Sequence, residues 1–372
     1  MALAKQKDGD KYKDEKIVGL GYDGRKDKHT RAMVADSHGT LGMRMIKEEH
    51  ISVTAEPSGK YLTHFVPDDP INPEKPALKV AQAIFDYLQE QCSLDSLLVL
   101  AGDSTNTNTG WKGGTHAYLE KLLGRKLFWA ICQIHTNELK LRHLIAKVDG
   151  PTSSDTGFMG EVCSQLSNVN EMEYDPEFRA LPGGEELIPI PEEVVNRMST
   201  DQKTSYKLVQ AVKTGVLPKE LQEMLCGPIC HARWLTTAQR IVFMWTRKHG
   251  FTAVNLKILE LLVKFCLVYY FKLYFDIKVK HHLEDAPYHI LTELRILKTL
   301  PLKVRDAISF YVRTGAWYAH SECLLLSLLT SKQYQDRKFA VDKILKKEGN
   351  LNMETRVSGQ GSHPSSTCQL QA

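Results

Sequence analysis

The chain has 372 residues, 42% of them hydrophobic and 25% charged, and it carries a formal net charge of +4. These proportions are those of an ordinary soluble globular protein, and the length excludes a single compact core, so we expect two domains or one domain with an insertion. The mild positive charge permits a nucleic-acid partner without indicating one, because binding depends on where the basic residues lie.

The first predicted elements are strands. Residues 1–15 are polar and rich in Lys and Asp, and we expect them to form a frayed lead-in. A short apolar run from Lys16 to Tyr22 then predicts a buried strand that Asp23 closes. Further strands are expected near Thr30–Ala35, His50–Ala55 and Tyr61–Val66. Turn residues separate the last two stretches, which indicates an antiparallel meander.

Helices and strands alternate after a Pro-rich connector at residues 67–76. Apolar residues at helical spacing predict a helix around Val80–Leu88, and Leu97–Ala101 predicts the next buried strand. The elements expected after it are a helix near Thr115–Leu123, a strand at Leu127–Ile131 and a helix from Gln133. The order β-β-β-α-β-α-β-α predicts an α/β domain with a mixed sheet over residues 16–148.

The pattern changes at residue 149. Residues 149–312 contain loops followed by helical patterns, and we interpret them as an all-helical insertion. Residues 313–347 predict the final helices of the α/β core, and the Ser- and Gln-rich residues 348–372 predict a disordered tail. The most apolar segment, Phe251–Ile277, is interrupted by Glu260, Lys264 and Lys272, which favours a buried helix over a membrane span.

Two aspartates give the first functional indication. Asp23 and Asp103 each follow a short apolar run, and carboxylates at the ends of neighbouring strands repel each other unless a cation lies between them. Mg²⁺ prefers carboxylate oxygens and keeps waters for a phosphate substrate, so the pair suits a site for Mg²⁺ or Mn²⁺. Taken alone, each Asp is also an ordinary turn residue, followed by Gly24 or Ser104.

The segments after the second aspartate allow two interpretations each. The polar loop Asp103–Gly110 could face a phosphate with its backbone amides, or it could be a plain strand-to-helix loop. Cys132 and His135 open the next helix at a spacing that suits a metal, but zinc needs four ligands. Residues that could complete such a site are Cys226, Cys230 and His231. We favour packing or hydrogen bonding of these groups over a zinc site.

Two further motifs lie later in the chain. In Arg233-Trp234 the guanidinium can pair with phosphate while the indole stacks on a base, and a packed Trp beside a surface Arg is the alternative. Glu322 opens the helix that follows the predicted insertion. A carboxylate is favoured electrostatically in the first turn of any helix, so this position alone does not establish a function.

In this order, the motifs around Asp23, Asp103, Cys132 with His135, and Arg233-Trp234 resemble those of transposases of the hAT (hobo/Activator) superfamily, over about residues 16 to 330. The resemblance implies an RNase-H-like mixed sheet that is interrupted by a large all-helical insertion and carries an Asp-Asp-Glu triad. Asp23, Asp103 and, by its position, Glu322 would hold two Mg²⁺ or Mn²⁺ ions for phosphoryl transfer. Trp234 would stack on a flipped base, with Arg233 near the backbone.

The same resemblance implies DNA, transposon ends in particular, as the partner, and it allows a homo-oligomer. Family members usually carry a zinc-finger module before the first acid and a hydrophobic dimerisation segment at the end. Here about fifteen residues precede the first strand, and a Ser/Gln-rich tail follows residue 349. We therefore expect either a DNA-cutting and strand-transferring catalytic core or an inactive, domesticated or truncated transposase that binds nucleic acid or protein.

Two remaining features concern chemistry and location. An RNase-H-like nuclease acting on RNA would use the same acids, but it would not need the helical insertion. The eight cysteines are scattered and the chain does not start with a signal peptide. Reduced thiols in the nucleus or cytoplasm are therefore expected.

Overall fold

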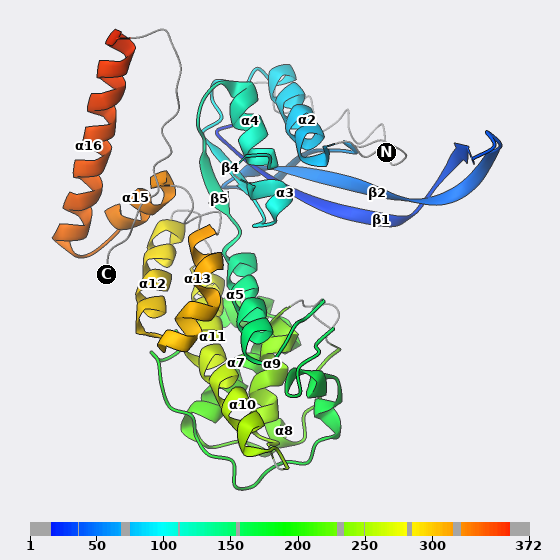
Figure 1. Ribbon diagram of the computed structural model, residues 1–372, viewed down its shortest axis with the longest axis vertical. Helices are drawn as coiled ribbons and strands as arrows, with labels where there is room; N and C mark the ends of the chain where they lie inside the picture. Colours follow the sequence, from blue (N-terminus) through cyan, green and yellow to red (C-terminus); the bar gives the residue numbers. More distant parts are fainter. Residues whose placement is uncertain are drawn as a thin grey trace.

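The computed structural model describes residues 16–35, 37–67, 75–110, 112–153, 157–228, 234–248, 250–280, 285–314 and 321–357. A sheet with its covering helices occupies one end of the molecule, and a group of helices occupies the other (Figure 1). The lead-in predicted at residues 1–15 lies outside the described residues.

A five-stranded mixed sheet in the order β3-β2-β1-β4-β5 forms the α/β part of the molecule. Its strands are β1 (Gly19–Ala35), β2 (Leu41–Glu56), β3 (Lys60–Phe65), β4 (Val99–Gly102) and β5 (Phe128–Ile131). The strands β1, β2 and β3 pair antiparallel, and β4 and β5 run parallel to β1. These are the order and directions of an RNase-H-like sheet, so the predicted fold class is confirmed.

The first strand differs from the prediction. It does not end at Asp23 but continues to Ala35, and it includes the separate strand expected near Thr30–Ala35, with a register shift after Asp27. The polar residues in between remain in the strand because the ladder with β2 supplies their backbone hydrogen bonds. Asp23 therefore lies inside a strand, opposite Ser52 of β2.

Helices cover one face of the sheet as their apolar spacing predicts. α2 (Pro76–Glu90) and α4 (Thr115–Leu123) lie side by side there, with the short α3 (Asn106–Thr109) between β4 and α4 in sequence (Figure 1). One core cluster joins these helices to the strands. Its members include Leu20, Val53 and Leu100 from the strands and Ile84, Leu88 and Leu119 from the helices.

The helical insertion has a core of its own. It follows α5 (Gln133–Val148), the last helix before residue 149. Its elements are the 3-10 helix η2 (Cys163–Glu171), α6 (Glu192–Arg197), α7 (Thr200–Thr214), α8 (Lys219–Gln222), α9 (Trp234–Trp245), α10 (Ala253–Phe265), the π-helical turn η3 (Cys266–Tyr270), α11 (Phe271–Val279), α12 (Ala286–Thr299) and α13 (Leu302–Thr314). All twelve residues of α9 are buried, so this helix is the centre of the insertion. Three apolar residues of α5, which leaves the sheet after β5, also pack into this core, namely Leu141, Leu144 and Ile145.

The apolar segment Phe251–Ile277 forms the helical run α10–η3–α11, as the sequence predicts. Four of the five residues in the π-helical turn are buried among the other helices of the insertion. Within the described ranges, none of the helices combines the length and the apolar character that a membrane crossing requires.

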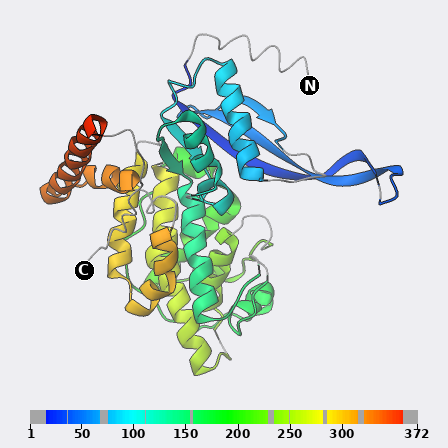
Figure 2. The same cartoon turned by 45° about the horizontal axis from the view of Figure 1, so that its top comes forward.

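The chain returns to the sheet after the insertion. Ile290 of α12 and Cys323 of α15 (Ser321–Leu329) both belong to the core cluster of the sheet. The Sγ of Cys323 lies 3.7 Å from the carbonyl oxygen of Trp129 in β5. Helix α15 therefore packs against the edge strand, and Figure 2 shows it between the body and the last helix, α16 (Tyr334–Val357).

The end of α16 differs from the prediction that residues 348–372 are disordered. The helix continues past residue 348 to Val357, and residues 358–372 lie outside the described residues. The continuation has a simple reason in sequence. The segment from Tyr334 to Val357 contains no Pro, and its single Gly, at position 349, lowers helix stability by only about 1 kcal/mol.

Candidate active site at the sheet edge

The register of β1 and β4 places the two predicted aspartates at comparable positions along the sheet. β1 and β4 pair as far as Gly21 opposite Ala101, and each aspartate lies two residues past that last pair. Asp23 is inside β1, whereas Asp103 directly follows β4, which ends at Gly102. Functional side chains of open α/β sheets gather outside the carboxyl ends of the parallel strands, and of the two aspartates Asp103 lies at such an end.

A glycine makes this close approach of the strands possible. A Cβ added to Gly102 would lie 3.1 Å from Nε2 of His116 and 3.3 Å from the ring of Tyr22. The side chains beneath the sheet edge therefore leave no room for a larger residue immediately before Asp103.

Asp23 points to the opposite face from its buried neighbour. Tyr22 is buried and Asp23 is exposed, as expected where successive strand residues alternate between the two faces. The exposed carboxylate is thus accessible from solvent on the face away from α2 and α4.

Asp103 is held in one orientation by its own loop. Its Oδ1 accepts hydrogen bonds from the backbone N–H of Thr105 at 3.0 Å, from Oγ1 of Thr105 at 2.7 Å and from Nδ2 of Asn108 at 2.7 Å. Three donors on a single oxygen occupy its lone pairs and restrain the rotation of the carboxylate. The polar loop thus fixes Asp103, and several of its amides bond to loop carbonyls instead of facing a phosphate.

His135 is the other group beside Asp103. Its Nδ1 lies 3.8 Å from the second carboxylate oxygen, Oδ2, which is a contact between charges if the imidazole is protonated but too long for a hydrogen bond. The start of α5 is tied to the same place, because the N–H of Cys132 donates to the carbonyl of Gly102 at 2.9 Å. The sequence motif Cys132/His135 therefore adjoins the second aspartate.

The free thiol of Cys132 is in its protonated form at neutral pH. Residue Cys132 as a whole is exposed, but desolvation of its sulfur raises its pKa, and the carboxylates of Glu138 and Asp103 raise that pKa further. The backbone amides of His135 and Ile134 act in the opposite direction.

Of the three residues that could complete a zinc site with Cys132 and His135, the structure describes only Cys226. Cys226 is buried in the core of the helical insertion, and burial raises the pKa of its thiol to about 12. Cys230 and His231 lie outside the described residues. Among the residues that the structure describes, no group of three or more His, Cys, Asp or Glu is arranged to hold a metal.

Trp234 takes the packed alternative. It begins α9, is only 7% exposed, and its ring meets that of Phe158 edge-on with centroids 5.9 Å apart. So little exposed surface leaves no face for a stacked base, and the expectation that Trp234 binds nucleic acid is corrected to a core role in this structure. Arg233 lies outside the described residues.

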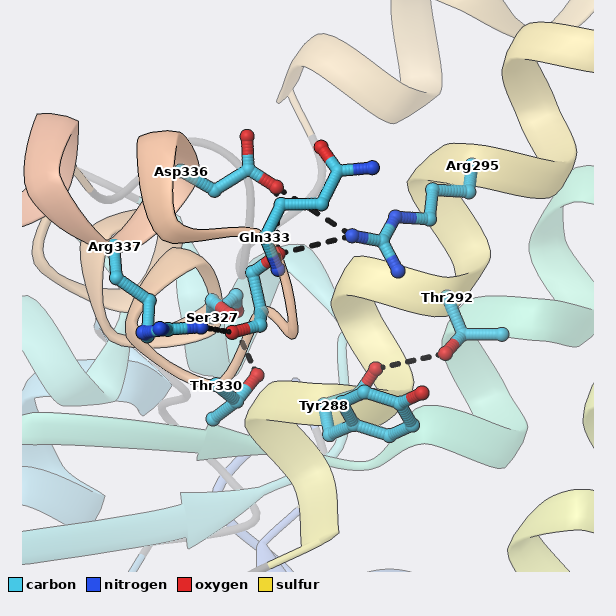
Figure 3. A network of polar contacts seen from close by, with 9 residues as sticks. Tyr288, Thr292, Arg295, Ser327, Thr330, Gln333, Asp336 and Arg337 are labelled. Atoms are coloured by element: carbon cyan, nitrogen blue, oxygen red, sulfur yellow. Dashed lines mark hydrogen bonds and ion pairs between the residues drawn. The ribbon is translucent and has the colours of Figure 1, made fainter.

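The position of Glu322 follows from its neighbours. Its side chain lies outside the described part of the chain, but the next residue, Cys323, is buried against β5. The far end of α15 is held by the polar network in Figure 3: Nη2 of Arg295 in α12 lies 3.0 Å from Oγ of Ser331 and 3.4 Å from Oδ2 of Asp336 in α16. The helix that carries Glu322 is thus fixed at the sheet; the role of Glu322 stays a prediction.

Sequence reasoning missed the aromatic cluster under this edge. The ring of His116, at the start of α4, lies edge-on to Tyr22 at 5.7 Å and to Trp129 at 4.7 Å. The indole N–H of Trp129 donates to Oε1 of the buried Glu120 at 2.9 Å. These residues come from β1, α4 and β5, so no spacing in the sequence indicates that they meet.

Comparison with known proteins gives little similarity. No family model matches the chain, and no curated protein matches it. Among solved structures, the chain is similar to a Drosophila P element transposase strand transfer complex, at 13% identity over 82% of this chain and 78% of that chain, with a TM-score of 0.22. The matched protein is a transposase, and nothing in the comparison singles out the hAT superfamily. A TM-score this low carries no argument, so the function must be argued from the residues of this chain.

Proposed function

We propose that this chain is a transposase-derived protein whose RNase-H-ordered sheet carries out metal-dependent DNA cutting and strand transfer, in the manner of hAT transposases. The observation that supports the proposal is that Asp23 and Asp103 each lie two residues past the last pair of the adjacent parallel strands β1 and β4. Glu322, on the helix that packs against β5, is the proposed third acid. The proposed partner is DNA at transposon ends, the proposed location is nuclear or cytoplasmic, and a homo-oligomer is the proposed assembly.

The donor set suits Mg²⁺ or Mn²⁺ better than zinc. The loop hydrogen bonds all go to Oδ1 of Asp103, so Oδ2 would be its ligand oxygen, and Asp23 would add an exposed carboxylate. Magnesium is commonly bound through one or two carboxylates together with waters and substrate phosphates. When bound, such an ion would activate a water or a 3′-hydroxyl and stabilise the leaving oxygen.

Each residue of the proposed site would have a separate role in binding the metal ion and the phosphate. Asp23 and Asp103 would position the scissile phosphate through the ion between them, and the Thr105 and Asn108 donors would keep Asp103 from turning away. His135, 3.8 Å from Oδ2 of Asp103, would add positive charge near the phosphate when protonated. These roles need the substrate to approach the exposed face of the sheet on which Asp23 lies.

A binding module without catalysis is the second candidate. One observation favours it: Trp234 is buried where base stacking would need it exposed. A domesticated or truncated transposase of this kind would keep the fold and bind nucleic acid or protein without cutting.

Metal-dependent nicking of supercoiled DNA separates the two candidates. The purified full chain is expected to nick DNA with Mg²⁺ or Mn²⁺, and Asp103→Asn is expected to lower the rate about 100-fold or more because a ligand charge is lost. Asp306→Asn, which removes an exposed carboxylate from α13, is the matched control and should nick normally. Glu322→Gln tests the third acid in the same assay.

Two outcomes contradict the catalytic proposal. One is nicking that is equal in the wild type and in Asp103→Asn, which would assign the cutting to a contaminant. The other is no nicking by a wild-type protein whose circular dichroism shows the expected helix and strand content, which would favour the binding module.

A further inference from the structure

Two strands of the sheet extend far beyond it. Among the described residues, β4 pairs with β1 only over Gly19–Gly21, and β3 pairs with β2 only over Ile51–Ala55. β1 and β2 nevertheless remain paired out to Ala35 opposite Leu41. Figures 1 and 2 show the result as a two-stranded ribbon that projects from the body of the molecule. We call residues 28–47 the outer ribbon.

One face of the outer ribbon is apolar and exposed. Successive cross-strand pairs of the ribbon point to opposite faces. One face therefore carries the side chains of every second pair, namely Arg31–Met45, Met33–Met43 and Ala35–Leu41. Four of these side chains are each more than half exposed: Met33, Leu41, Met43 and Met45. Because a lone two-stranded ribbon is barely stable in water and exposed edges invite pairing, an uncovered ribbon of this length indicates a binding partner.

The charge of the outer ribbon points to the chemistry of that partner. In sequence, residues 28–47 contain four cations, Lys28, Arg31, Arg44 and Lys47, and the single acid Asp36, which gives a formal net charge of +3. The adjoining acids Asp27, Glu48 and Glu49 balance this charge, so the positive charge is confined to the stretch between them. Among the side chains that the structure describes there, Arg31 and Arg44 are exposed cations.

Duplex DNA fits this combination of shape, charge and apolar contact. The major groove of DNA admits a two-stranded β-ribbon, arginine pairs with phosphates or guanine edges, and apolar side chains contact thymine methyl groups. A protein partner on the apolar face would instead have to accommodate Arg31, which shares that face with Met33 and Met43.

The ribbon is continuous with the candidate active site. Asp23 and the outer ribbon belong to the same strand, and Ala35 lies twelve residues beyond Asp23. At about 3.4 Å per residue this is a reach of about 40 Å, close to one turn of B-DNA at about 34 Å. DNA held by the ribbon would therefore be contacted about one helical turn from the phosphate at the sheet edge.

We propose that the outer β1–β2 ribbon, residues 28–47, is a DNA-binding arm that lies in a groove of the duplex whose phosphate is presented to Asp23 and Asp103. This arm rests on the proposed function, because it assumes a DNA substrate. It adds the segment that binds the DNA and the position on the DNA at which this segment binds, about one helical turn from the phosphate at the active site.

The double variant Arg31→Ala/Arg44→Ala tests the arm in the full chain. Binding to a fluorescently labelled duplex several helical turns long is measured by anisotropy at several salt concentrations. The variant is expected to bind about tenfold more weakly or worse, and the slope of log K against log salt should fall by about 2, since about 0.9 is lost for each phosphate contact. Both arginines are exposed, so circular dichroism should be unchanged.

A matched control removes the same charge elsewhere. Arg197→Ala/Lys219→Ala takes two exposed cations from α6 and α8 in the helical insertion and should leave both affinity and salt slope unchanged. If the two double variants changed DNA affinity and salt slope equally, or if neither changed them, the proposal of a DNA-binding arm would be overturned.

A third variant separates DNA from a second copy of the chain as the occupant of the apolar face. Met33→Ser/Met43→Ser should weaken DNA binding and leave the sedimentation coefficient unchanged. A wild-type dimer that this variant dissociates, with DNA affinity intact, would overturn the arm in favour of self-association.

The arm and the proposed function fail in different ways. The double arginine variant tests the arm through DNA binding, whereas Asp103→Asn tests the proposed function through metal-dependent nicking. If the arginine variant binds and nicks like the wild type, the arm is wrong and the proposed function stands. If the wild type neither binds nor nicks duplex DNA, the proposed function fails and the arm fails with it.

Discussion

Asn108 offers the sharpest test of how Asp103 is held. Thr105 bonds Oδ1 of Asp103 with both its backbone and its hydroxyl, whereas Asn108 contributes a single side-chain bond at 2.7 Å. Asn108→Ala removes that bond without altering the tight turn at Thr105. Because groups that orient a metal ligand typically change metal affinity 10- to 100-fold, we expect half-maximal nicking to need about tenfold more Mn²⁺.

The control for this prediction lies in the same loop. Asn106 is exposed and opens α3 without bonding to Asp103 in the structure. Asn106→Ala should therefore leave the Mn²⁺ dependence unchanged. A similar shift in both variants would mean that loop stability, and not the orientation of the carboxylate, sets the metal requirement.

Single residues differ in how far the sequence could indicate their surroundings. The sequence predicted that Asp23 and Asp103 each close a strand; Asp103 does follow β4, but β1 continues past Asp23 to Ala35. The hydrogen bonds from Thr105 and Asn108 could not be predicted, since many polar loops have the same composition. The burial of Trp234 depends on α9 being enclosed on all sides, which a local Arg-Trp motif does not reveal.

Among the elements, the junction of β4 with its loop depends on a glycine. A Cβ at Gly102 would come within 3.1 Å of His116 and 3.3 Å of Tyr22, both of which are buried. Gly102→Ala is therefore expected to lower the free energy of unfolding by about 1–3 kcal/mol, because neither ring can move without disturbing the other. Urea unfolding monitored by circular dichroism measures this change.

Gly42 provides the comparison for Gly102. It also lies in a strand, but nothing is found within 4 Å of a Cβ added there. Gly42→Ala should leave stability unchanged or raise it slightly, by less than about 1 kcal/mol, through the reduced freedom of the unfolded chain. Equal losses in the two variants would show that strand glycines, and not the crowding around Gly102, set the effect.

The elements also show where periodicity was sufficient and where it was not. α2, α4 and β5 lie where apolar spacing predicts them, because each buries one face against the sheet. The extent of β1 was missed because Gly24 and Arg25 are exposed, while the ladder with β2 holds the backbone from Gly24 to Asp27 in the strand. Hydrophobic patterns indicate which faces of an element are buried, so they do not predict a strand that extends into solvent beyond the body of the protein.

At the scale of the whole molecule, a buried ion pair links the helical insertion to the helix that leaves the sheet. Lys140 of α5 pairs with Glu293 of α12, and both side chains are at most 3% exposed. The hydroxyl of Tyr269, in the π-helical turn η3, donates to the same Glu293 carboxylate. Three segments far apart in sequence therefore meet at one charge cluster, which no local motif could predict.

The two partners of this pair are expected to differ in the cost of their removal. Lys140→Met leaves the Glu293 carboxylate buried without its cation, which should lower the free energy of unfolding by about 3–5 kcal/mol. Glu293→Gln should cost less, because burial already lowers the pKa of Lys140 well below its ordinary value, so the ammonium can release its proton. The double variant Lys140→Met/Glu293→Gln keeps an acceptor for Tyr269 and should recover about half of the loss. Urea unfolding of the three variants at neutral pH measures these differences, and a double variant as unstable as the sum of the two single variants would show that the charges do not interact.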